Sequence, residues 1–217
     1  MKIWNLSDPE NHYYAGAETL GAFQQPQPKY GRGVRTSPLI IRWDGQAKVA
    51  GDFTFPTDKD VMLKRSVGEE LLAAGFRDFV LGSVEIRNRD QKTLRRNLPL
   101  GLAYEFAEIL IRKLVPLEKT KSTFVTELNR GKIYYKMPGL AHTKLENWDA
   151  KTGHMDIIFV PREKGKGFFV PESLLAGCDI FQVSEFEGRF LCTDRFKEYV
   201  VKRGYTNVSF LEVGDVI

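Results

Sequence analysis

The chain has 217 residues, a formal net charge of +4 and a pI near 9.0. Hydrophobic residues make up 42% of it, which is enough for a buried core without disulfide or metal support. No stretch resembles the roughly 20 apolar residues that cross a bilayer. Polar residues follow Leu6, where a signal peptide would stay apolar, so we expect a cytoplasmic protein that does not bind membranes.

Residues that usually carry chemistry are sparse and scattered. Cys178 and Cys192 lack the paired spacing of a zinc site, and we expect both to be buried free thiols. The three histidines match no ligand spacing, and 31–33 and 165–167 are isolated Gly-x-Gly elements that are typical of turns. The sequence therefore predicts no catalytic residue, cofactor or metal site.

The N-terminal part of the chain is predicted to contain two strands separated by a loop. Residues 2–6 alternate polar and apolar side chains, and 39–43 form a second short apolar run. Residues 24–38, rich in Gln, Pro, Gly and Arg, predict an irregular surface loop. Asp44-Gly45 is a strong hairpin signal, so we expect 46–55 to return as the partner strand of 39–43.

The segment from Met62 to Arg87 predicts a helix, a glycine stop and a strand. Val67 and Leu71 lie on one side of the helix, Gly75 ends it, and 79–86 follow as the strand.

Near the C-terminus the same arrangement returns. Thr193 or Asp194 caps a helix that ends at Gly204, and 208–213 follow as a strand. The two segments suggest a duplicated helix-glycine-strand unit, although this order of elements is common.

Between these units, Pro99 to Leu114 predicts the strongest helix of the chain. Apolar residues recur there at helical spacing, and Pro116 would end the helix. On such a helix Glu105 and Glu108 share a face, which we interpret as the solvated face.

Further short strands are expected at 132–137, 155–160, 167–170, 179–183 and 189–191, with Glu187-Gly188 as a turn before the last. The predicted fold class is α+β, with several short, mostly antiparallel strands and about three helices. We expect a single domain over 1–217, with a division into 1–115 and 132–217 as the alternative.

A basic cluster lies at 87–96, where five Lys or Arg residues against Asp90 carry a local charge of +4. We interpret the cluster as a solvated loop, because a nucleic-acid site would also carry aromatic residues for base stacking. A nucleic-acid-binding module that uses this segment is an alternative function.

A second alternative is a metal-dependent nuclease. Asp78 with Asp90-x-Lys92 resembles the pattern in which carboxylates hold a divalent ion and a lysine stabilises charge on the phosphate. The polar residues around Asp90 predict a turn, however, and this chemistry needs its lysine on a rigid strand.

Three C-terminal segments resemble the ending of bacterial polymorphic-toxin immunity proteins: 179–183, 190–198 and 207–213. In particular they are similar to the double-CxxCG immunity family and related families, which finish with a strand, a helix that begins S/T-x-R-F, a glycine and a strand. Residues 62–89 fit the middle section of that family, and the opening residues 1–6 are also similar. Neither CxxC pair of the family is present, so metal binding is not implied.

The resemblance implies a cytosolic protein that neutralises a cognate protein toxin by direct binding, without catalytic residues. The basic net charge suits a toxin with an acidic binding surface better than it suits mimicry of nucleic acid. Several aromatic residues lie in polar surroundings, but the sequence singles out none of them as an interface: Tyr13, Tyr14, Phe23, Tyr30, Trp148, Phe168 and Phe169.

Overall fold

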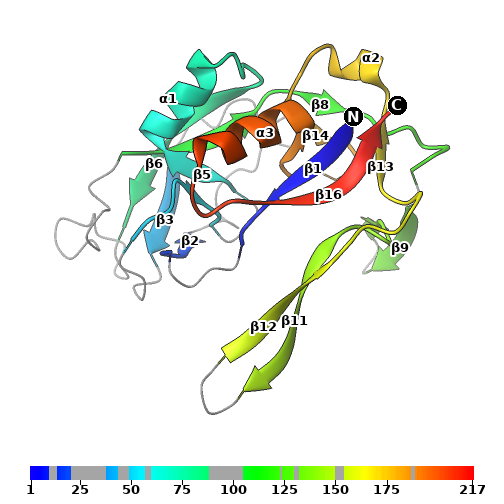
Figure 1. Ribbon diagram of the computed structural model, residues 1–217, viewed down its shortest axis with the longest axis horizontal. Helices are drawn as coiled ribbons and strands as arrows, with labels where there is room; N and C mark the ends of the chain where they lie inside the picture. The colour runs from blue at the N-terminus through cyan, green and yellow to red at the C-terminus, as the bar shows by residue number, and fades with distance from the viewer. Residues whose placement is uncertain are drawn as a thin grey trace.

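A computed structural model describes residues 1–9, 14–20, 38–43, 49–56, 60–87, 105–122, 124–129, 132–149, 154–186 and 189–217. Within these residues the fold is α+β, as predicted, with two six-stranded sheets, two separate hairpins and three helices (Figure 1). Most strand pairs are antiparallel, also as predicted.

The first sheet contains both ends of the chain, and we call it the terminal sheet. Its strands, in spatial order, are β13 (Phe168–Val170), β16 (Ser209–Val216), β1 (Lys2–Ser7), β15 (Leu191–Thr193), β14 (Ile180–Val183) and β8 (Leu114–Val115). The second sheet runs β2 (Ala17–Thr19), β3 (Leu39–Trp43), β6 (Phe79–Ile86), β7 (Phe106–Ile111), β5 (Met62–Lys64) and β4 (Phe53–Thr54).

The remaining elements are two hairpins and three helices. The hairpins pair β9 (Val125–Asn129) with β10 (Lys132–Lys136), and β11 (His142–Asp149) with β12 (His154–Val160). The helices are α1 (Arg65–Ala73), the single turn α2 (Glu172–Leu175), and α3 (Asp194–Arg203). The hairpin β11–β12 projects from the body of the molecule (Figure 1).

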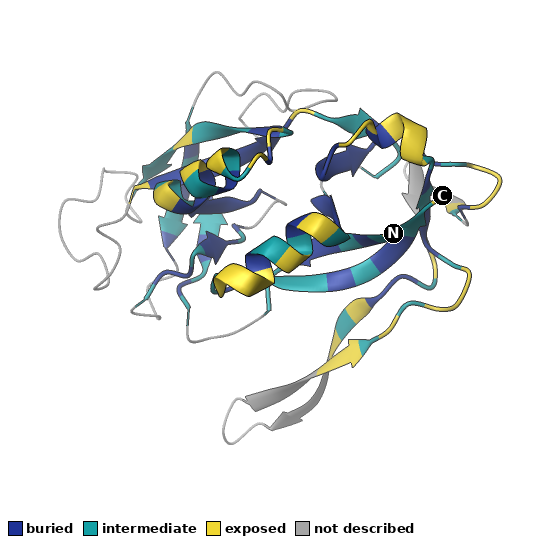
Figure 2. Ribbon diagram, turned by 45° about the horizontal axis from the view of Figure 1, so that its top comes forward, coloured by how far each residue is buried: buried dark blue, intermediate teal, exposed yellow. Residues whose placement is uncertain are grey.

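Both predicted helix-glycine-strand segments are confirmed. Helix α1 is followed by Gly75 with φ +95°, and α3 by Gly204 with φ +69°. Glycine adopts this left-handed backbone without a steric cost, so each helix ends there and the chain turns into the next strand. Each helix is exposed on one side and buried on the other (Figure 2).

The sheet topology extends the repeat well beyond the helices. Strands β3, β6, β7, β5 and β4 lie side by side in the order of β13, β16, β1, β15 and β14. Each neighbouring pair has the same sense in both sheets, parallel for the first pair and antiparallel for the other three. We call these the first unit (39–111) and the second unit (168–216 with β1). The repeat is circularly permuted, because β7 follows β6 whereas its counterpart β1 begins the chain.

Reciprocal contacts hold the two units together. Asp52, just before β4, accepts hydrogen bonds from the backbone N–H (2.8 Å) and hydroxyl (2.9 Å) of Thr206, which lies in the loop after α3. At the position that the repeat relates to this one, Asp78 in the loop after α1 accepts hydrogen bonds from the backbone N–H of Asp179 (2.8 Å), just before β14, and from that of Ile180 (3.3 Å), which begins β14. The two contacts are placed as in a two-fold interface, but both carboxylates belong to the first unit.

A shared apolar core lies between the units. The ring of Phe76, after α1, packs edge-on against Phe196 and Tyr199 of α3, with centroids 5.1 and 5.2 Å apart. Cys192 also lies in this core, and Cys178 is buried in a second cluster beneath the terminal sheet. Both thiols are free, as predicted, and burial raises the pKa of each.

The predicted helix over Pro99–Leu114 is wrong. Residues 106–111 form β7, which is buried along its whole length between β6 and β5. A strand covered on both faces needs apolar residues at nearly every position, and such a run also satisfies helical spacing. Glu105 and Glu108 therefore do not share a solvated helical face: Glu108 is buried in β7, and Glu105 forms an ion pair with Arg65 (2.8 Å).

One other expectation differs from the structure. Strand β3 has β2 and β6 as its neighbours, and residues 53–54 pair with β5 at the far end of the sheet, so the predicted return strand at 46–55 is wrong. The single domain over 1–217 and its alternative division at 116–131 stay predictions. None of the helices in the described part of the chain is long and apolar enough to span a membrane.

Candidate functional site

The residues of the two alternative functions lie partly outside the described chain. Asp78 is described, and its carboxylate holds the backbone of the second unit. Asp90 and Lys92 lie outside the described residues, as does the basic cluster except Arg87, which forms an ion pair with Glu85 (2.8 Å). Within the described residues no group of three His, Cys, Asp or Glu side chains could hold a metal ion.

The base of the hairpin β11–β12 is fixed to the body on the β12 side by an arginine. Arg162 follows β12, and its side chain is only 8% exposed. Its guanidinium donates to Asp215 (2.8 Å) and Glu212 (2.7 Å) on β16, and to the carbonyl of Lys166 (3.0 Å). The last contact closes the predicted turn at 165–167, where Gly165 and Gly167 have φ +76° and +119°.

The β11 side of the hairpin is anchored by apolar burial. Met137, Leu140 and Ala141, just before β11, are buried in the cluster beneath the terminal sheet. The hairpin therefore leaves the body as an arm with two fixed ends at its base. The contacts at its base therefore set the direction in which the arm leaves the body.

Apolar side chains are exposed on this arm close to its base. Phe159 is 54% exposed and Ile158 is 38% exposed. Their Cα partners across the hairpin are Thr143 and Lys144. Because neighbouring residues of a strand point to opposite faces, each face of the arm carries one of these apolar side chains.

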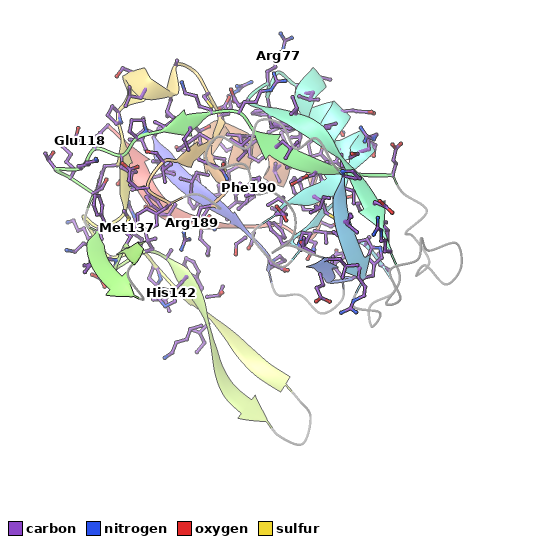
Figure 3. All side chains as sticks on the ribbon, turned by 180° about the vertical axis from the view of Figure 1, so that it is seen from behind. Arg77, Glu118, Met137, His142, Arg189 and Phe190 are labelled. Atoms are coloured by element: carbon purple, nitrogen blue, oxygen red, sulfur yellow. The ribbon has the colours of Figure 1, made fainter. Side chains whose placement is uncertain are left out.

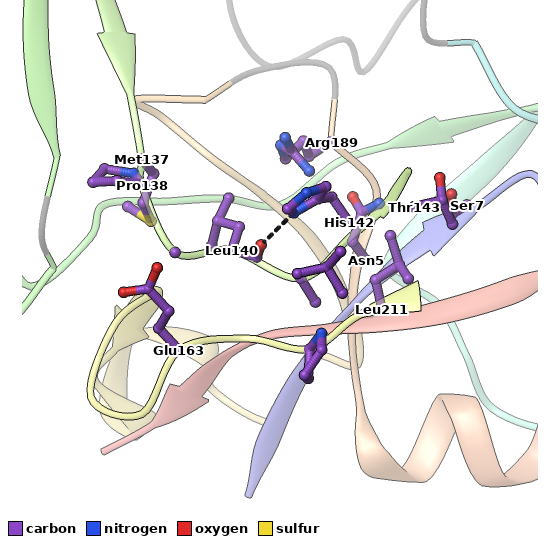
Figure 4. Close-up of a pocket in the computed structure, with 14 residues that line it drawn as sticks. Asn5, Ser7, Met137, Pro138, Leu140, His142, Thr143, Glu163, Arg189 and Leu211 are labelled. Carbon is purple, nitrogen blue, oxygen red and sulfur yellow. Dashed lines mark hydrogen bonds between the residues drawn. The ribbon is translucent and has the colours of Figure 1, made fainter. Parts of the chain in front are cut away.

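A hollow of about 560 Å³ lies between the base of the arm and the terminal sheet (Figure 4). We call it the arm-base groove, and its walls come from five separate parts of the chain: Asn5, Ser7, Met137, Pro138, Gly139, Leu140, Ala141, His142, Thr143, Val160, Pro161, Glu163, Arg189 and Leu211.

The alternation of residues before β15 places Arg189 in this groove. Phe190 and Cys192 belong to the shared core, whereas Leu191 belongs to the cluster on the opposite face of the terminal sheet. Arg189 is two residues before Leu191 and lies on the same side as Leu191. Figure 4 shows it beside His142, away from Glu163 at the other end of the groove.

The polar neighbours of Arg189 already have acceptors inside the protein. The side-chain amide of Asn5 donates to the carbonyl of Leu6 (3.0 Å), and the hydroxyl of Ser7 to that of Asp8 (3.3 Å). Nδ1 of His142 lies 3.0 Å from the carbonyl of Leu140, which can only accept, so this nitrogen carries the proton.

No protein-family model matches this chain, and no curated protein matches its sequence. The resemblance to immunity proteins therefore stays a prediction that rests on the residues quoted for it.

Sequence reasoning did not find the arm-base groove. The predicted aromatic candidates include Phe168, which is buried in the core, and not Phe159. The signal for Arg189 was local: an arginine two residues before Leu191 continues the core-facing side of a strand, where an apolar residue is usual. The groove itself could not be predicted, because its walls are far apart in the sequence.

Proposed function

We propose that this chain is an immunity protein, which neutralises a cognate bacterial toxin by binding it through the β11–β12 arm and the arm-base groove. The observation that carries the proposal is an anchored arm with exposed apolar side chains beside a groove that contains an arginine. Protein interfaces concentrate their binding energy in aromatic and arginine anchors of this kind.

The arm has two further properties that suit binding to a protein. Within the described pairings, β11 and β12 form a sheet of two strands only, and a two-stranded sheet offers two edges to a partner. The net charge of +4 would attract a toxin with an acidic surface and speed its association.

The test is a pull-down with this protein as bait and the product of the neighbouring gene as prey, followed by co-expression to measure rescue of growth. We expect a stoichiometric complex with nanomolar affinity or better, about −12 kcal/mol.

The F159A substitution should weaken this complex at least tenfold, because it removes an aromatic anchor from the arm. V201A is the matched control, since Val201 is 62% exposed on α3 and lies outside the arm and the groove. The absence of any complex, or equal affinities for F159A and V201A, would overturn the proposal. Nucleic-acid binding that weakens steeply with salt would favour the alternative at 87–96.

A further inference from the structure

Two covered arginines lie close to the arm base, and their surroundings differ. Arg162 is held by the carboxylates of Asp215 and Glu212, and its pKa is raised, since these ion pairs outweigh the lowering by burial. Arg189 contacts no carboxylate among the described residues, and burial lowers its pKa.

Arg189 is partly buried, and a guanidinium that loses part of its hydration without gaining an ion pair carries a free-energy cost. The cost is removed when a ligand supplies the anion. Arg189 lines an open groove, so that anion can reach it from solvent.

The shape and charge of the groove favour one class of anion. A single guanidinium matches one carboxylate in charge, and its planar fork can donate two parallel hydrogen bonds to the two carboxylate oxygens. The other walls include Met137, Leu140 and Leu211, which suit the methylene groups of an amino-acid side chain better than a phosphate dianion. Glu163 carries negative charge, but it lies at the other end (Figure 4).

We propose that the arm-base groove binds a carboxylate, supplied by an Asp or Glu side chain of the partner protein, with Arg189 as its ion-pair partner. The partner segment lies against the base of the arm beside Phe159. The source of the carboxylate rests on the proposed function, but the site itself can be tested without the toxin.

The first test uses the full chain labelled with ¹⁵N and a small probe, acetyl-glutamate N-methylamide. We expect saturable shifts of the Arg189 Nε–H signal and of the backbone amides of 139–143. The neutral glutamine analogue should give no such shifts, and inorganic phosphate should give smaller ones. No saturable shift with the glutamate probe would overturn the site, and a stronger response to phosphate would overturn the carboxylate assignment.

The second test uses R189Q, with R77Q as the matched control. Arg77 is an exposed arginine far from the groove (Figure 3). R189Q should abolish the shifts and weaken toxin binding at least tenfold, and R77Q should change neither. Toxin binding that is unaffected by R189Q would reject this inference and leave the immunity function standing.

A measurement of thermal stability tests whether Arg189 serves a ligand site or has a structural role. Arg189 is partly buried, and removal of its uncompensated charge relieves a cost, so the melting temperature of R189L should equal or exceed that of the wild type. A fall of several degrees would show that Arg189 has a structural partner and would overturn the proposal.

Discussion

Asp52 of the first unit contacts the second unit through Thr206. Besides its bonds to Thr206, its carboxylate accepts a hydrogen bond from Lys64 (3.0 Å). Burial by itself would raise the pKa of Asp52, but the hydrogen bonds from Thr206 and Lys64 outweigh it, and the pKa lies below its ordinary value of 3.8. The ionised form of the Asp52 carboxyl therefore stabilises the folded protein.

We expect D52N to lower the free energy of unfolding by about 1–2 kcal/mol at pH 7, measured by urea denaturation. Because the folded pKa is lowered, this contribution is complete above about pH 4 and disappears as the pH falls through the folded pKa. The difference between wild type and D52N should therefore shrink at pH 3. E69Q, on the exposed side of α1, is the control, and an equal loss in E69Q would contradict the role of Asp52.

At the scale of the elements, strand β16 lies very close to the backbone of its neighbour β13. Its pairing with β1 contains a bulge, in which Ile3 lies opposite Gly214 and Trp4 opposite Glu212. On its other side β16 pairs with β13, where Gly214 lies opposite Phe168. A Cβ built on Gly214 would overlap the backbone carbonyl of Phe168.

G214A should therefore lower the free energy of unfolding by about 1–3 kcal/mol, because a backbone carbonyl cannot turn away. In G82A the new Cβ would lie 2.9 Å from Cδ1 of Leu110, the end of a flexible side chain that can move aside. Urea denaturation should give the smaller loss for G82A. A larger loss of stability in G82A than in G214A would show that β13 can shift without cost.

The elements also show which parts of the fold could be predicted. Helices α1 and α3 were predictable because their apolar stripe and their glycine stop are both local in the sequence. Strand β7 was not, because its burial between two neighbouring strands removes the alternation that identifies a strand. Neither Arg189 nor Phe159 could be assigned to the arm-base groove without the packing of distant segments.

At the scale of the whole molecule, the permuted repeat makes the chain ends neighbours. The backbone N–H of Val216 donates to the carbonyl of Met1 (2.9 Å), and the two ends lie next to each other, where β1 begins and β16 ends (Figure 1). A linker between the ends would place β1 directly after β16, which is the order of β6 and β7 in the first unit.

A circular permutant that joins Ile217 to Met1 through a short Gly-Ser linker and opens within 10–13 should fold to the same structure. We expect an unchanged circular dichroism spectrum and a melting temperature within a few degrees of the wild type. A permutant opened within 74–78 should be much less stable, because the cut breaks the loop that holds Asp78 against the second unit. Equal stability of the two permutants would argue against the reciprocal contacts.

The position of β1 also lengthens the loops that folding must close. Strand β1 pairs with β15 and β16, which lie within residues 191–216. Contacts between such distant residues close long loops and slow the folding rate. We therefore expect the terminal sheet, and with it the arm-base groove, to form late in folding, and an intermediate without this sheet would expose the apolar side chains of β1 to aggregation.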